Sequence, residues 1–158
     1  MKGKPKLIGI ISKILMPSDG SKTAKKAAAY AVDLAKQLNA SIIILSVIEQ
    51  HPLIATTVPA SETASHTIQP IEYYLKKAAE QYTGEIKELC DKNGVVSKIS
   101  IKTGHPVEEI VKEAKRSKSN LIVMGSRGRS ALSATVLGSV SYGVIHHDTS
   151  IPILIVKD

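Results

Sequence analysis

Apolar positions along the chain follow two spacings, one typical of buried strands and the other typical of amphipathic helices. The segment 41–48 is almost continuously apolar, as expected for a strand that is covered on both faces. Between residues 21 and 38, apolar residues instead recur at every third or fourth position, which is the helical spacing. Ser21 can cap the start of this helix, and Asn39 can end it.

The rest of the pattern continues this alternation of strand and helix. Further strands are predicted over 14–17, with a start as early as residue 8, and over 95–102, 121–124 and 152–156. Further helices are predicted over 70–92, 106–118 and 139–147. Strands joined by helices need crossover connections, which make neighbouring strands parallel. The chain is therefore predicted to be a single domain, 1–158, of class α/β: an open, doubly wound parallel sheet of five strands, Rossmann-like, with helices on both faces.

Two segments fall outside this alternation. Residues 49–69 have no periodicity and contain two prolines and many Ser and Thr residues, so a long variable loop is predicted there. Residues 1–11 form a basic tail that leads into the first strand. The apolar run from Leu7 to Ile11 is too short for a signal peptide or a membrane span, so a cytoplasmic protein is expected.

Composition and charge narrow the class of function. Hydrophobic residues make up 43% of the chain and charged residues 22%, as in ordinary globular proteins. The net charge of +7 lies mostly in the first 26 residues, and no basic patch is interleaved with aromatic residues. Nucleic-acid binding is therefore less favoured than a solvated tail. The single cysteine, Cys90, falls on an apolar helix face and is predicted to be a buried structural thiol.

The segment after the predicted strand 121–124 carries the strongest chemical signal. Gly125 and Gly128 can adopt positive φ, and without a Cβ they let a ligand approach the backbone. Arg127 adds positive charge, and Gly138-Ser139 opens a helix whose N-terminal amides and dipole favour an anion. The segment therefore predicts a bound phosphate chain. The alternative is a glycine-rich connection that binds nothing. The usual P-loop and dinucleotide motifs do not occur.

The spacing Gly125-x2-Gly128-x9-Gly138-Ser139 resembles the G-2x-G-9x-G-[S/T] signature of the universal stress protein family. The opening Met-Pro-Ser-Asp-Gly-Ser at 16–21, the turn at 104–110 and the closing apolar strand 152–156 are also similar. The likeness covers roughly residues 12–157. It implies the strand order 3-2-1-4-5 and the ATP-binding branch of the family, because other branches lack these glycines.

The resemblance also implies roles for individual residues. Pro17 and Val47 would lie beside the adenine, and Asp19 would lie near the ribose or a bound divalent ion such as Mg²⁺. The base and ribose would be lined by Met124 and Gly125. The phosphates of ATP, or of ADP or AMP in its place, would be surrounded by Arg127, Gly128, Gly138, Ser139, Val140 and Ser141. A turn that helps to begin the next helix is the alternative role for Asp19.

The function expected from these features is that of an ATP-binding regulator or sensor of the stress response. Nucleotide occupancy would modulate contacts within a dimer or with an unidentified protein partner, with little or no catalysis, because no base is placed to activate water. The alternative is a slow ATPase or an adenylate-using transferase on the same scaffold. The last strand is apolar on both faces and is expected at a sheet edge, where it would form a homodimer.

Overall fold

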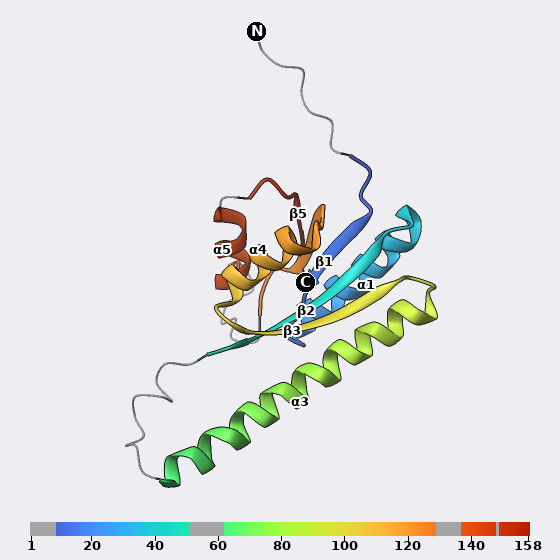
Figure 1. Cartoon of the computed structure of the whole chain (residues 1–158). Helices are drawn as coiled ribbons and strands as arrows, with labels where there is room; N and C mark the ends of the chain where they lie inside the picture. The colour runs from blue at the N-terminus through green and yellow to red at the C-terminus, as the bar shows by residue number, and fades with distance from the viewer. Residues whose placement is uncertain (1–8, 51–61, 129–136, 148) are drawn as a thin grey trace.

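The strands form one parallel sheet in the order β3-β2-β1-β4-β5, as predicted. The computed structural model describes residues 9–50, 62–128, 137–147 and 149–158, with the backbone alone for 62–70 (Figure 1). The strands are β1 (Lys13–Pro17), β2 (Ser41–Glu49), β3 (Ser97–Gly104), β4 (Leu121–Gly125) and β5 (Ile153–Val156). Because all neighbouring pairs are parallel, every strand ends at the same edge of the sheet.

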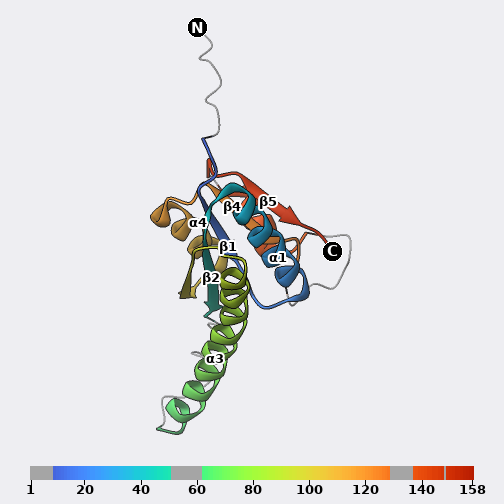
Figure 2. The same cartoon turned by 90° about the vertical axis from the view of Figure 1, so that its right-hand side faces the viewer.

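Helices cover both faces of this sheet (Figures 1 and 2). They are α1 (Lys22–Leu38), α3 (Glu62–Lys92), α4 (Pro106–Ser117) and α5 (Ser139–His146). The predicted caps of the first helix are confirmed: the Ser21 hydroxyl accepts a hydrogen bond from the amide of Ala24 at 3.2 Å. Asn39 ends the helix in the left-handed region, with φ of 52°.

Two apolar cores lie on opposite faces of the sheet because successive strand residues point to opposite sides. Ile14, Met16 and Ile42 pack on the α1 and α3 side. Leu15 and Met124 pack on the α4 and α5 side. The buried thiol predicted at Cys90 is confirmed within the first core, and burial raises the pKa of this thiol.

The start of α3 differs from the prediction. The helix begins at Glu62, so residues 62–69 are helical although a loop was expected there, and Pro70 lies inside the helix rather than at its start. Proline fixes φ near the helical value, and inside a helix it removes one hydrogen bond. The first part of α3 extends beyond the sheet, where water can satisfy the carbonyl that loses its partner (Figure 1). Residues 51–61 of the expected loop, and the tail 1–8, lie outside the described residues.

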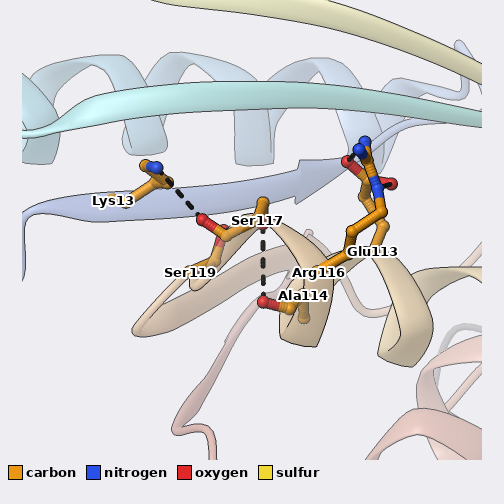
Figure 3. Close-up of polar contacts among 6 residues, drawn as sticks. All are labelled: Lys13, Glu113, Ala114, Arg116, Ser117 and Ser119. Carbon is orange, nitrogen blue, oxygen red and sulfur yellow. Dashed lines mark hydrogen bonds and ion pairs between the residues drawn. The ribbon is translucent and has the colours of Figure 1, made fainter.

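Polar contacts stabilise the last turns of α4 and join its end to the start of β1, at the edge of the sheet where the strands begin (Figure 3). The ammonium of Lys13 donates to the carbonyl of Ser117 at 3.0 Å. The carboxylate of Glu113, whose side chain is 4% exposed, accepts from Arg116 Nε at 3.0 Å and Nη2 at 2.6 Å. The hydrogen bond to Glu113 raises the pKa of Arg116. These contacts support the fold from the side opposite to the strand ends.

Two helical glycines provide a matched test of the packing of α5 on α4. A Cβ on Gly84, within α3, would meet nothing within 4 Å, whereas one on Gly143 would lie 2.6 Å from Val107 Cγ2. Gly84→Ala is expected to raise the free energy of unfolding by about 0.5–1 kcal/mol, because alanine loses less backbone entropy. Gly143→Ala is expected to lower it by about 1–3 kcal/mol through overpacking. Urea unfolding measures both changes, and equal stability of the two variants would refute this packing.

Candidate functional site

Two loops come together where β1 and β4 end. The two strands are neighbours in the sheet and run in parallel, so residues 17–21 and the glycine loop, defined here as residues 125–128, leave the sheet at the same edge. The Thr23 hydroxyl, in the first turn of α1, donates to the carbonyl of Arg127 at 2.5 Å. This bond joins the loop after β4 to the helix after β1.

Asp19 lies between these two loops. Its Oδ1 accepts a hydrogen bond from the amide of Ser21 at 2.9 Å, which closes a turn immediately before α1. Its Oδ2 would lie 2.8 Å from a Cβ built on Gly128. Gly20 beside it has φ of 75°, a conformation that favours glycine. The carboxylate therefore shapes the turn and also faces the glycine loop.

The glycines of this region permit close packing of the protein on itself. Gly125 and Gly128 can adopt positive φ, but among the glycines of the described residues only Gly20, Gly94 and Gly104 do so. A Cβ on Gly125 would instead lie 2.9 Å from the carbonyl carbon of Thr23. Neither Gly125 nor Gly128 therefore uses the positive φ that the sequence allows. Close approach of the loop to α1 and Asp19 explains both residues.

The start of α5 is held against the glycine loop. Gly138 is the N-cap residue, and its amide donates to the carbonyl of Ser126 at 2.7 Å. A Cβ on Gly138 would lie 3.1 Å from Arg127 Cα. The buried Ser141 hydroxyl donates to the carbonyl of Gly125 at 2.8 Å. The first turn of α5 has no acidic residue and no side-chain cap, so its amides present a positive dipole end at the loop.

The structure brings together several residues that were predicted to bind phosphate. It directs the side chain of one of them, Arg127, elsewhere. Gly128, Gly138 and Ser139 meet at this junction, where Gly128 and Ser139 are exposed. The Ser141 hydroxyl is already hydrogen-bonded within the protein. The backbone of Arg127 belongs to the same junction, but its guanidinium forms an ion pair with Asp158 at 2.5 Å.

The residues predicted to contact the base share one face of the sheet. Met124 and Val47 both pack with the core on the α4 and α5 side. Pro17 lies two positions after Leu15, which is in the same core, so strand alternation directs Pro17 to that face as well. Val140, in the first turn of α5, packs against this core too. The face carrying these apolar residues ends at the glycine loop.

Comparison with known proteins decides the family. The family described as "Universal stress protein family" matches residues 11–157, nearly the whole chain. The chain belongs to the universal stress protein family. Universal stress protein MJ0531 of Methanocaldococcus jannaschii is 30% identical over 94% of this chain and 83% of its own length. Universal stress protein YxiE of Bacillus subtilis is 34% identical over 94% of this chain and 100% of its own length.

Solved structures agree with this assignment. Protein MJ0577, also from Methanocaldococcus jannaschii, is 30% identical in the structural match and has a TM-score of 0.77, covering 95% of this chain and 98% of its own. More distant structures show the fold alone. One is a universal stress protein in complex with cAMP, 21% identical with a TM-score of 0.68, matched over 94% of this chain and 98% of its own. Another, from Archaeoglobus fulgidus, is in complex with dAMP, 18% identical with a TM-score of 0.60, matched over 94% of this chain and 100% of its own.

In this universal stress protein, Asp19 is the predicted metal ligand. No group of three or more His, Cys, Asp or Glu side chains that could hold a metal ion occurs within the described residues. Mg²⁺ commonly binds through one or two carboxylates together with phosphate oxygens and water. A metal at Asp19 therefore stays a prediction, and it would need phosphate oxygens and water as further ligands. Likewise, no helix in the described ranges is long and apolar enough to cross a membrane.

A cavity of about 270 Å³ lies between α1 and α3, and none of the residues predicted to contact nucleotide lines it. It is lined by helix residues of both charges, including Lys25, Glu85 and Lys92, together with Ser18 and Gly20 of the first loop. Its walls contain none of the three motif glycines. The candidate site is therefore defined by the glycine loop, Asp19 and α5, and not by this cavity.

Sequence reasoning did not identify two residues that contact the glycine loop. Thr23 bonds to the Arg127 carbonyl, and Asp158 pairs with the Arg127 side chain. In the sequence, nothing distinguishes Thr23 from any other residue in the first turn of a helix. A sequence signal for Asp158 does exist: it lies two residues beyond the last strand, as Arg127 lies two residues beyond Gly125.

Proposed function

We propose that this universal stress protein binds ATP at the junction of the glycine loop, Asp19 and the start of α5. The observation that carries the proposal is the packing of Gly138 against Arg127, which brings the unpaired amides of α5 beside the exposed Gly128. Helix amides and glycine backbone together favour a polyanion. The complexes of two related structures with cAMP and dAMP support an adenine nucleotide as the ligand.

In this proposal Pro17, Val47 and Met124 contact the adenine from the α4 and α5 side. The base and ribose also meet Gly125 and Asp19. The phosphates are surrounded by Arg127, Gly128, Gly138, Ser139, Val140 and Ser141. Main-chain amides of Gly128 and of the first turn of α5 would hold them, because the Gly138 amide and the Ser141 hydroxyl already donate to carbonyls of the loop. Mg²⁺ would be held by Asp19 and phosphate oxygens, where it would offset phosphate charge.

The bound nucleotide acts as a regulatory signal in this proposal. Among the described residues, two carboxylates contact the glycine loop. Asp158 pairs with Arg127. Asp19 faces Gly128, and one of its oxygens accepts the Ser21 amide. It is therefore better placed to shape the turn than to activate water. We propose little or no ATP hydrolysis. A slow ATPase or an adenylate-using transferase is the alternative, since the same cradle would hold the substrate of either enzyme.

Nucleotide occupancy would be communicated through β5, which lies at the edge of the sheet. Its residues are half-buried and apolar, and β5 pairs with β4 beside the glycine loop. We propose a homodimer through this strand, because an apolar sheet edge favours pairing with a second chain. A protein partner would be the alternative occupant of the same edge. The unpaired Cys90 suits a reducing compartment, so a cytoplasmic location belongs to this proposal.

The test is to measure binding and turnover with one protein preparation. Isothermal titration with ATP, ADP, AMP and GTP is expected to show binding of adenine nucleotides and no comparable binding of GTP. Chromatography after long incubation with ATP and Mg²⁺ is expected to recover intact ATP, whereas many turnovers per protein molecule would establish the enzyme alternative. Sedimentation with and without ATP tests the dimer. Absence of heat with every adenine nucleotide would refute the proposed site.

A further inference from the structure

The Arg127 side chain is directed along the sheet toward β5. In the β4–β5 pair, Gly125 is registered with Val156, and the Ser126 amide donates to the Val156 carbonyl at 2.9 Å. Two residues beyond this register, Arg127 lies opposite Asp158. The distance between Arg127 Nη2 and Asp158 Oδ2 is 2.5 Å. The parallel register therefore supplies a carboxylate to the arginine of the glycine loop.

The Arg127 side chain is more buried than either partner of an exposed ion pair on α3. The Arg127 side chain is 14% exposed and the Asp158 side chain 46% exposed, whereas both partners of the Lys87–Asp91 pair on α3 are exposed. Salt screens a partly buried pair less than an exposed one. The Arg127 carbonyl is held separately by the Thr23 hydroxyl at 2.5 Å. The guanidinium can therefore leave Asp158 while the main chain of the loop stays in place.

We propose that Asp158 competes with the bound phosphates for Arg127, which lowers the affinity of the site for a triphosphate more than for a monophosphate. The inference rests on the proposed nucleotide site. Guanidinium recognises carboxylates and phosphates through the same planar donors. A triphosphate carries enough charge to draw Arg127 away from Asp158, whereas a monophosphate competes less well. Asp158 thus lowers affinity for every phosphorylated ligand and leaves recognition of the adenosine part unchanged.

The experiment compares Asp158→Asn with the wild-type protein by titration with ATP, AMP and adenosine. Removing the competing carboxylate is expected to tighten ATP binding by about two- to fivefold, the range that a partly exposed ion pair supports. The gain is expected to be smaller for AMP and absent for adenosine. Asp91→Asn is the matched control, because it removes the same charge from the exposed Lys87–Asp91 pair on α3. It is expected to leave ATP affinity unchanged.

A second pair of variants separates competition for Arg127 from a general field effect. In an Arg127→Gln background, Asp158→Asn is expected to give no further gain in ATP affinity. A gain of the same size in that background would overturn the inference, as would unchanged or weaker ATP binding by Asp158→Asn alone. If wild type binds ATP and either result occurs, only this inference falls. If neither wild type nor Asp158→Asn binds ATP, adenosine or AMP, the proposed function falls with it.

Discussion

Gly138→Val is expected to weaken ATP binding by about 100-fold or more, the cost of losing two hydrogen bonds to charged phosphate groups. A Cβ at this position would lie 3.1 Å from Arg127 Cα and 3.3 Å from the Ser126 carbonyl oxygen, and valine adds two methyl groups. Both neighbours are main-chain atoms of the glycine loop. The start of α5 must therefore move away from the loop, which breaks the 2.7 Å bond from the Gly138 amide.

Titration calorimetry measures this loss, and Gly84→Val is the matched control because a Cβ on Gly84 meets nothing within 4 Å. Circular dichroism must show that the sheet and helices of both variants are retained. The displaced residues lie at one helix end, so we expect the fold of Gly138→Val to persist. Wild-type affinity for ATP in a folded Gly138→Val variant would contradict the assignment of the site.

Gly125→Ala is expected to lower the free energy of unfolding by about 1–3 kcal/mol, through overpacking against main chain. The added Cβ would lie 2.9 Å from the carbonyl carbon of Thr23 and 3.0 Å from its carbonyl oxygen. Helix α1 has a fixed backbone at this turn, so neither atom can yield without moving the helix. The Thr23 bond to the Arg127 carbonyl would lengthen as well, and ATP binding should weaken with it.

Urea unfolding of Gly125→Ala checks this expectation. Gly84→Ala is the control, because it replaces a helical glycine where an added Cβ meets nothing within 4 Å. Gly128→Ala provides a further comparison, because among the described residues its new Cβ meets the Asp19 carboxylate and no main chain. A side chain can rotate, so Gly128→Ala should be less destabilising than Gly125→Ala. Wild-type stability of Gly125→Ala would refute the contact between the glycine loop and α1.

Much of the site could be located from sequence because its parts follow strand ends. The apolar run at 121–124 predicts β4, and the motif glycines then fall at its end. Parallel strands place that end beside the end of β1, so Asp19 could be assigned to the same edge before any contact was known.

The start of α3 was harder to predict from the sequence. Pro70 indicated a helix start, and local sequence does not show that a proline is tolerated within a helix that extends past the sheet.

The sequence by itself determined the alternation of elements, the parallel sheet and the segment that carries the site, because periodicity and motif spacing are properties of neighbouring residues. Only the tertiary structure decided what the glycines contact and where the Arg127 side chain goes. Thr23 and Arg127 are 104 positions apart, and Arg127 and Asp158 are 31 apart. Such contacts depend on strand register and helix placement, which are set by packing of the whole core rather than by neighbouring residues alone.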